Sequence, residues 1–222
     1  MNNRKIKAVI FDMDGVITDT MPYHFRAWHK IFLDNGVKVS KFDVYCREGQ
    51  KGAESIQEIF ANAGIEISTA KAKKIITDKE ILFKKIVRRR FIPGVRSLLK
   101  TLHLLGIRLA LVTGTARHEV QHALPSDILT LFEVTVTGTD VKQGKPDPEP
   151  YLKALEGLKL RGEEGIVIEN APFGILAAKA AKLKCYAIAT SLPVQYLRKA
   201  DMIFKDFRKL RTVLLRSLEI NA

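Results

Sequence analysis

The sequence predicts an α/β fold in which a doubly wound, mostly parallel sheet carries an inserted all-helical cap domain. Six short apolar runs rich in β-branched residues are typical of buried strands, at residues 6–11, 107–112, 133–136, 166–168, 185–189 and 202–204. Helical patterns separate most of these runs, and this alternation favours parallel strands joined by right-handed crossovers. Between Thr20 and Pro93, however, the strand signal disappears.

The segment after the first strand is too long to be a simple crossover. Its helical patterns cover residues 23–35, 53–63 and 70–90. We therefore expect residues 20–92 to form a cap domain, and residues 1–19 together with 93–222 to form the α/β core domain. The two linkers between these parts lie beside the expected site, so they are candidate hinges for closing the cap over a substrate.

Composition places the chain among ordinary globular proteins. With 222 residues and 46% apolar content it is long enough for a full core, as one large domain or one domain with an insert. No apolar run approaches the roughly 18 residues of a membrane span, and the N-terminus has no signal-peptide core. We expect a soluble, cytoplasmic monomer without a membrane segment. Cys46 and Cys185 match no metal or redox spacing and are expected to be buried free thiols.

The formal net charge of +13 is concentrated in residues 71–90, which hold nine Lys/Arg against two acidic residues. Such a segment can bind nucleic acid or attract anionic substrates over a distance. Apolar residues recur through it at near-helical spacing, so the simplest interpretation is an amphipathic helix with a solvated basic face. No aromatic stacking platform accompanies the charge, which makes nucleic acid the less favoured partner.

Two carboxylates, Asp12 and Asp14, follow directly on the first apolar run, at the strand end where ligands bind in open α/β sheets. If the strand continued, both would face the same side, and Gly15 allows the backbone to bend beside them. The pair suits a hard cation, with one carboxylate free as a nucleophile and the other as a proton carrier. The alternative is a plain Asp-x-Asp-Gly turn that ends a strand.

Three more polar segments follow apolar runs. Thr113-Gly114-Thr115, just before a helix start expected at Ala116, offers a hydroxyl and backbone N–H groups for phosphate oxygens, although it is also an ordinary turn. Lys145 lies in a Gly-Lys-Pro-Asp-Pro stretch that two prolines keep non-helical, and can act as a point charge for phosphate. Glu169-Asn170 supplies an acid and an amide carbonyl, oxygen donors of the kind that Mg²⁺ accepts.

Taken together, these four strand ends resemble the haloacid dehalogenase superfamily, within the subgroup of phosphatases and mutases that resemble beta-phosphoglucomutase and carry a helical cap. The resemblance extends over nearly the whole chain. It includes residues 12–20, 23–28 and 93–95, the Thr113 segment, Gly144-Lys145-Pro146 and residues 169–174. The fold it implies is a Rossmann-like core with a cap domain.

The resemblance implies that Asp12 takes the phosphoryl group as an aspartyl-phosphate and that Asp14 protonates the leaving oxygen. It also implies Mg²⁺ as the cofactor, held by Asp12, the Asp14 backbone carbonyl and Asn170, with Glu169 nearby or ligating. Lys145 and Thr113 would neutralise the rest of the phosphate charge. Many relatives carry an aspartate where this chain has Asn170, and an amide brings no charge, so Mg²⁺ binding is expected to be weaker.

Two cap positions carry further expectations. His24 lies one turn before Trp28 on the first cap helix, which by spacing alone indicates a packed residue. The resemblance instead implies that His24 lies over Asp14. Beta-phosphoglucomutase has a Ser-Arg pair after a Gly-x, with an arginine that clamps the far phosphate of a bisphosphate, and that position is Gly52 here. Lys51 or a lysine of residues 71–90 is then the substitute phosphate ligand.

We therefore predict a Mg²⁺-dependent phosphatase for small phosphorylated metabolites, with sugar phosphates as the favoured class. The closest alternative is a beta-phosphoglucomutase-like isomerase, which must retain its bisphosphate intermediate and exclude water. A distant alternative of another class is a non-catalytic, nucleic-acid-associated protein that uses the basic helix.

Overall fold

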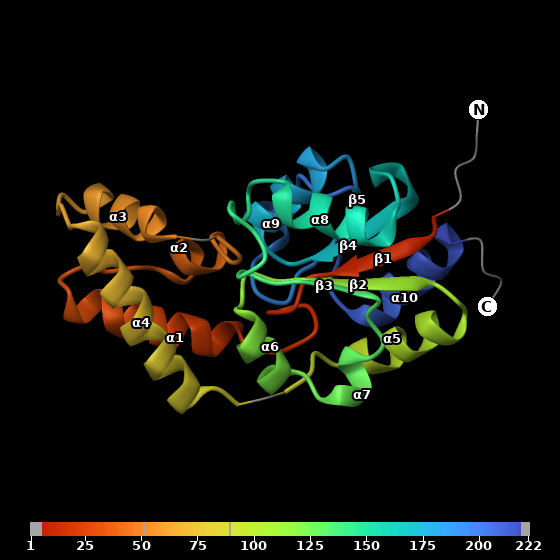
Figure 1. Ribbon diagram of the computed structural model, residues 1–222, viewed down its shortest axis with the longest axis horizontal. Coiled ribbons are helices and arrows are strands. Elements are labelled where there is room, and N and C mark those ends of the chain that lie inside the picture. The colour runs from red at the N-terminus through yellow and green to blue at the C-terminus, as the bar shows by residue number, and fades with distance from the viewer. Residues whose placement is uncertain (1–5, 51, 89, 219–222) are drawn as a thin grey trace.

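A six-stranded sheet lies at the centre of the larger part of the molecule in the computed structural model, which describes residues 6–50, 52–88 and 90–218 (Figure 1). The strands are β1 (Ala8–Phe11), β2 (Arg108–Val112), β3 (Val134–Val136), β4 (Gly165–Glu169), β5 (Lys184–Ile188) and β6 (Met202–Phe204). Their order is β3-β2-β1-β4-β5-β6, and every neighbouring pair is parallel. All six predicted strands are present, with ends shifted by at most two residues. The predicted fold class is confirmed.

Helices cover both faces of the sheet, which explains why the strands are continuous apolar runs rather than alternating ones. On β1, Ala8 and Ile10 belong to one buried apolar cluster, whereas Val9 and Phe11 belong to the other. Figure 1 shows α8 and α9 above the sheet and α5 and α10 below it. The helices and 3-10 turns of this core are α5 (Val95–Leu104), α6 (Arg117–Ala123), α7 (Ser126–Leu129), α8 (Glu149–Leu158), η1 (Gly162–Glu164), α9 (Pro172–Ala180), η2 (Val194–Tyr196) and α10 (Phe207–Ser217).

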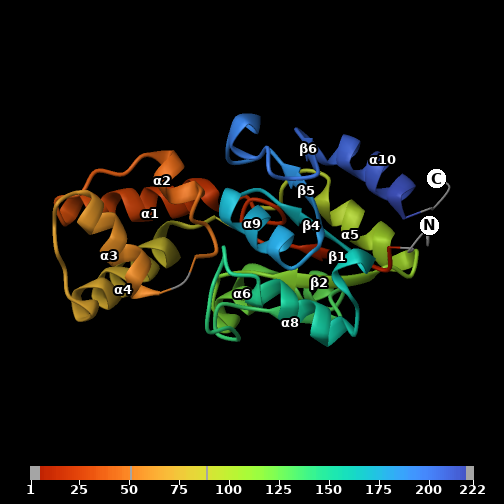
Figure 2. The same cartoon turned by 90° about the horizontal axis from the view of Figure 1, so that it is seen from above.

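Between β1 and β2 the chain forms a helical cap that lies beyond one end of the sheet, on the left in Figures 1 and 2. Its helices are α1 (Met21–Asp34), α2 (Lys41–Tyr45), α3 (Ala53–Asn62) and α4 (Thr69–Ile86). The short α2 was not predicted, because five residues are too few to show a helical period. Its signal is local instead: Ser40 and Asp43 form a capping box, in which Ser40 Oγ accepts from the Asp43 N–H at 3.2 Å.

The predicted helix at residues 70–90 is too long at its C-terminus, since α4 ends at Ile86 and Val87 has an extended backbone. The reason lies in the return linker, which must leave the cap to pair with the outgoing one. The Asp19 N–H donates to the Arg90 carbonyl at 2.8 Å, and the Ile92 N–H donates to the Ile17 carbonyl at 2.9 Å. The two linkers therefore run side by side at the base of the cap. The division into domains of residues 20–92 and 1–19 with 93–222 stays a prediction.

Most basic residues of α4 are exposed, as expected for an amphipathic helix whose buried residues Ala72 and Ile75 pack inside the cap. Lys79 is the exception, because its side chain is partly buried and turned toward the core. Elsewhere, Cys46 and Cys185 are buried and free, as predicted. Within the described ranges, no helix combines the length and apolar character needed to cross a membrane.

The lower layer of the core offers a test of the packing. Leu99 of α5 is fully buried against the sheet, so Leu99→Ala should lower the free energy of unfolding by about 2–5 kcal/mol through lost burial and a residual cavity. Leu104 ends the same helix and is 85% exposed, so Leu104→Ala should change stability by only about 0.5 kcal/mol. Urea denaturation of the two variants measures the difference, and equal losses would contradict the packing described.

Candidate active site

The strand end at Asp12 is tied to its neighbours by one buried lysine. The Asp12 N–H donates to the Ile168 carbonyl at 3.0 Å, which keeps Asp12 in line with the β1–β4 pairing. Lys145 Nζ donates to Asp12 Oδ1 at 2.6 Å and to Glu169 Oε1 at 2.7 Å. All three side chains are almost completely buried. Residues from three separate segments thus meet at the carboxyl edge of the sheet, where the sequence predicted them.

Both carboxylate oxygens of Glu169 accept two hydrogen bonds each. Besides Lys145, Oε1 accepts from the Tyr151 hydroxyl at 3.1 Å, and Oε2 accepts from the backbone N–H groups of Asn170 and Ala171 at 2.7 and 2.9 Å. These bonds fix the carboxylate and, through it, the position of Lys145 Nζ. Tyr151 was missed by the sequence reasoning, because nothing distinguishes it there from other apolar residues of α8.

The charges of this cluster do not balance. Burial alone would lower the pKa of Lys145, but the carboxylates of Asp12 and Glu169 outweigh it and raise the pKa, so the lysine is cationic. Burial also raises the pKa of Asp12, and Lys145 opposes this only in part. Two carboxylates share one ammonium here, and the carboxylate of Asp14 lies close by. A buried site with this excess of negative charge favours an added cation.

Two buried oxygens indicate where a cation would fit. Asp12 Oδ2 and Asn170 Oδ1 have no hydrogen-bond partner within the described residues, although both are fully enclosed. Asn170 is oriented by its Nδ2, which donates to Ser191 Oγ at 2.8 Å and leaves the carbonyl oxygen free. Unsatisfied buried oxygens are costly unless something completes them. A carboxylate and an amide oxygen are the donors that Mg²⁺ takes, so the residues present fit that ion.

Asp14 is held by hydroxyl groups and a histidine rather than by a lysine. Thr20 and Thr115 donate to its two oxygens, Thr115 at 3.0 Å, and Thr18 and the His24 Nε2 atom lie at 3.4 Å from Oδ1. Burial alone would raise the pKa of Asp14, but the hydrogen bonds from His24, Thr20 and Thr115 lower it to about 2. Without a ligand, Asp14 is therefore ionised.

The Thr113-Gly114-Thr115 segment lies at the same edge, between β2 and α6. Thr113 is buried, and its hydroxyl accepts from the Thr115 N–H at 3.1 Å. The helix start predicted at Ala116 is confirmed, since Ala116 caps the N-terminus of α6. The Thr115 hydroxyl is engaged by Asp14, so the segment contacts the proton-carrier candidate as well as the expected position of a phosphate.

His24 reaches down from cap helix α1 and lies over Asp14, as the sequence resemblance implied. Its ring stacks on Phe83 of α4 with a centroid distance of 4.1 Å. Lys79 Nζ lies 3.1 Å from Nδ1 and stands over the rings of Trp28 and Phe83. An ammonium can only donate, so Nδ1 accepts and Nε2 carries the hydrogen that points to Asp14. His24 and Trp28 thus pack together with Lys79 and Phe83 in one group of side chains.

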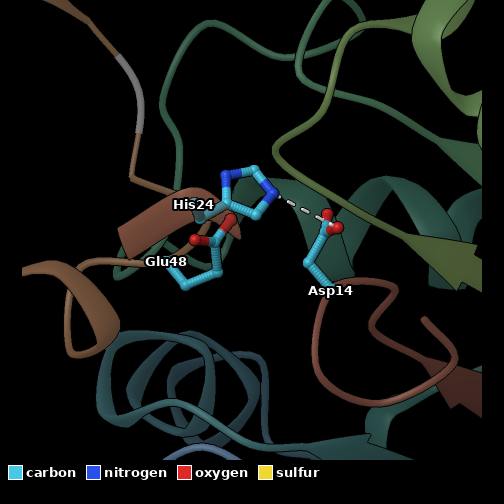
Figure 3. A group of neighbouring side chains, drawn as sticks. All are labelled: Asp14, His24 and Glu48. Carbon is cyan, nitrogen blue, oxygen red and sulfur yellow. Dashed lines mark hydrogen bonds and ion pairs between the residues drawn. The ribbon is translucent and has the colours of Figure 1, made fainter. Parts of the chain in front are cut away.

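Glu48, on the loop after α2, joins this group from a second cap segment. A ligand atom from each of Asp14, His24 and Glu48 lies within 4.8 Å of the other two (Figure 3). Such a trio resembles a metal site, but the Lys79 ammonium assigns the Nε2 proton and adds a positive charge next to it. The free oxygens of Asp12 and Asn170 are better ligands for a cation. No motif or spacing in the sequence identified Glu48 as a candidate site residue.

The cap loop that carries Glu48 lies directly on the core. A Cβ atom on Gly49 would stand 2.6 Å from Lys145 Cδ, and one on Gly114 would stand 2.7 Å from Gly49 Cα. The Phe173 N–H at the start of α9 donates to the Cys46 carbonyl at 3.3 Å. Contacts this close leave no layer of water between cap and core, so the structure is the closed form.

A cavity of about 420 Å³ remains between the closed cap and the core. Its floor contains Gly114 and Thr115, and its walls come from all four cap helices and their loops. The charged and polar residues among its lining are His24, Asp43, Arg47, Glu48, Gln50, Ser55, Lys73, Lys79, Glu80, Thr115, Glu119 and Thr139. The volume is that of a site for a small molecule.

Nearly all the predicted site residues converge on this edge of the sheet. The two aspartates, Thr113, Gly114, Thr115, Lys145, Glu169, Asn170 and His24 lie together. Lys51, predicted as a substitute phosphate ligand, lies outside the described residues. Gly52 lines the cavity, so no side chain extends from the position where an arginine was expected in the mutases.

Proteins similar to this chain combine the same fold with phosphate chemistry. Residues 6–182 match the family described as haloacid dehalogenase-like hydrolase. A protein of Thermotoga maritima named phosphorylated carbohydrates phosphatase is 35% identical over 191 residues, which cover 84% of this chain and 87% of the relative. The beta-phosphoglucomutase of Bacillus subtilis is 31% identical over 219 residues, covering 95% of this chain and 94% of the relative.

Solved structures extend the similarity to the arrangement in space. A crystal structure of beta-phosphoglucomutase from Clostridium difficile matches with a TM-score of 0.82 and 26% identity, covering 96% of this chain and 97% of the other. Both a phosphatase and a mutase are therefore among the similar proteins.

The contact between Gly49 and Lys145 predicts how the cap can be opened. Gly49→Ala should hinder closure, because Lys145 is fixed by two carboxylates and cannot move aside. The Phe173 amide, bonded across the closed interface, should then exchange its hydrogen at least about tenfold faster. Gly64→Ala is the matched control: its φ of +75° resembles the +79° of Gly49, but nothing lies within 4 Å. Equal effects of the two substitutions would show that backbone strain alone is responsible.

Proposed function

Since the chain belongs to the haloacid dehalogenase-like hydrolases, we propose that it is a Mg²⁺-dependent phosphatase that hydrolyses phosphate monoesters of small carbohydrates through an aspartyl-phosphate. Membership of the family confirms the resemblance found in the sequence, and it makes the chain an enzyme. The observation that carries the finer proposal is that Asp12, which accepts from the Lys145 ammonium, and Asn170 each have one free, buried oxygen. This arrangement supplies a nucleophile, a cation site and a fixed positive charge within one small volume.

In the proposed reaction, an Asp12 oxygen bonds to phosphorus while the bond from phosphorus to the ester oxygen breaks. The ester oxygen takes a proton from Asp14 and leaves as an alcohol. Water then attacks the phosphorus of the aspartyl-phosphate, Asp14 accepts a proton from that water, and inorganic phosphate leaves. Asp12 and Asp14 are thereby restored to their starting states.

Asp14 suits the second half of this cycle as it stands. Its pKa of about 2 keeps it ionised, the state that accepts a proton from water. The first half requires Asp14 in its protonated form, and a bound phosphate ester favours that form because a like charge nearby raises the pKa of a carboxyl group. His24, with Lys79 at its Nδ1 atom, contacts Asp14 from the cap, so closure of the cap adds a donor to those that Thr20 and Thr115 already supply.

The charge of the transferring group is matched by residues of the core. Lys145 presents a cation that two carboxylates hold in place, and Thr113 with Gly114 forms the adjoining wall. Asp12 Oδ2, Asn170 Oδ1 and the Asp14 backbone carbonyl are the proposed ligands of Mg²⁺, while the four bonds of Glu169 favour a positioning role. Mg²⁺, when bound, neutralises phosphoryl oxygens and lets two anions approach each other.

Hydrolysis is favoured over phosphosugar isomerisation by the cap. A mutase has to hold the second phosphate of its bisphosphate intermediate, and the position expected for its arginine is Gly52, which adds no side chain to the cavity wall. The similarity to a beta-phosphoglucomutase keeps the isomerase as the second candidate. Transient opening at the paired linkers would admit the water that hydrolysis needs.

The central test is Mg²⁺-dependent release of phosphate from a panel of sugar and sugar-alcohol monophosphates. Asp12→Asn should reduce turnover by at least about 10²-fold in a protein that remains folded by circular dichroism, because an amide cannot attack phosphorus. Asp34→Asn, on the exposed end of α1, is the control for loss of one carboxylate and should retain activity. Turnover by Asp12→Asn within tenfold of the wild type would refute the nucleophile assignment, and isomerisation without phosphate release would favour the mutase.

Asn170 allows a separate test of the cation site. Asn170→Asp should lower the Mg²⁺ concentration for half-maximal rate, because it adds a negative charge beside a free oxygen of Asp12. Ser191 can keep its contact by donating to the new carboxylate, so the local packing should be preserved. Titration of the rate with Mg²⁺ measures the effect, and an unchanged or higher requirement would place Asn170 outside the influence of the ion.

A further inference from the structure

The Glu48 carboxylate is the unexplained charge of the cap. It belongs to the loop that lies on the core, it lines the cavity, and it is half-buried. Within the part of the chain that the structure describes, its carboxylate makes no hydrogen bond and no ion pair. Figure 3 shows it beside the His24 ring, near Asp14. A partly buried carboxylate without a donor is available to bind a ligand.

The other acidic residues of the cavity wall are already engaged or lie on another segment. Asp43 accepts from the Ser40 N–H at 2.7 Å as part of the α2 capping box. Glu119 lies 3.1 Å from Lys84, an ion pair that joins core to cap. Glu80 follows Lys79 on α4 and is not part of the trio around Asp14. Glu48 is thus the carboxylate of the cavity wall that lies within 4.8 Å of Asp14, the proposed proton carrier for the leaving oxygen.

Lys79, a cation of the same cavity wall, is already engaged by other groups. Glu48 raises the pKa of Lys79, although burial lowers it more. The Lys79 ammonium is held at His24 Nδ1 and over two aromatic rings, so it cannot move to a second phosphate without releasing His24. Arg47 also lines the cavity, but its Nη1 donates to the Asp43 carbonyl at 3.4 Å and its guanidinium lies 5.9 Å from the centre of the Phe173 ring, whereas Lys73 is exposed. Beside His24, the wall therefore presents the Glu48 carboxylate, which accepts hydrogen bonds and carries a negative charge.

We propose that Glu48 determines specificity, by accepting hydroxyl groups of a neutral polyol leaving group and by rejecting substrates with a second phosphate. This inference rests on the phosphatase function proposed above and narrows its substrate class to phosphate monoesters of uncharged polyhydroxylated alcohols. A carboxylate accepts hydrogen bonds and donates none, so it pairs with hydroxyls. The same charge repels a distant phosphate, which is specificity by exclusion. Gly52 offers no cation and Glu48 adds a negative charge, so both residues of this loop disfavour a second phosphate.

The test compares a hexose 6-phosphate with the 1,6-bisphosphate of the same hexose, as the ratio of their kcat/KM values at saturating Mg²⁺. The wild type should prefer the monophosphate. In Glu48→Gln that preference should fall about tenfold, mainly because the bisphosphate becomes a better substrate when a like charge is removed. Glu48→Asp keeps the charge and should retain the preference. Glu66→Gln removes an exposed cap carboxylate outside the cavity lining and should leave the ratio unchanged.

A second measurement needs no variant, and so it stands even if a substitution disturbs folding. Raising the ionic strength screens the repulsion, and the wild-type preference for the monophosphate should shrink accordingly. A wild-type preference for the bisphosphate, a ratio independent of salt, or an unchanged ratio in folded Glu48→Gln would each overturn the role of Glu48 while leaving the phosphatase intact. Absence of Mg²⁺-dependent phosphate release from any monophosphate, including an aryl phosphate, would instead refute the proposed function itself.

Discussion

The sharing of one ammonium group between Asp12 and Glu169 is the interaction on which the rest of the site depends. Lys145 comes from the loop before α8, Asp12 from the end of β1, and Glu169 from the end of β4, so the two ion pairs fix three strand-end segments relative to one another. Both oxygens of the Glu169 carboxylate accept further hydrogen bonds, and these bonds offset the free-energy cost of burying its charge. A charged group without such partners in this cluster would destabilise the fold. The same lysine side chain forms the surface on which Gly49 of the cap rests.

The sharing of one ammonium by two carboxylates also explains why the site favours binding of a cation. The sheet places the carboxyl ends of β1 and β4 next to each other, and because Asp12 follows β1 and Glu169 ends β4, negative charge accumulates at one edge. One lysine cannot neutralise it, and Asp14 adds to the excess. The free oxygens of Asp12 and Asn170 belong to residues that follow these two strands. Binding of substrate phosphate, cation and lysine is therefore coupled through electrostatics more than through shape.

Chemistry and selection are divided between the two parts of the molecule. Core residues carry the proposed nucleophile, cation ligands and fixed positive charge, whereas the cap supplies the walls of the leaving-group cavity. His24 connects the parts, because its Nε2 atom lies 3.4 Å from Asp14 Oδ1 while Lys79 Nζ lies 3.1 Å from its Nδ1 atom. A change in the cap loop can then alter the accepted leaving group without altering the reacting centre, as the contrast between an arginine and Gly52 illustrates.

The sequence by itself determined the sheet, the helical insertion and nearly every core residue of the site. Each strand is a continuous apolar run because both its faces are buried, and parallel strands bring their polar ends to one edge, so local patterns suffice to place Asp12, Thr113, Lys145 and Glu169 there. Tertiary structure alone decided the roles of Tyr151, Lys79 and Glu48, the early end of α4, and the closure of Gly49 onto Lys145. These features arise from contacts between segments far apart in the chain, and no periodicity or turn signal records which side chain of a helix or loop will face a distant partner.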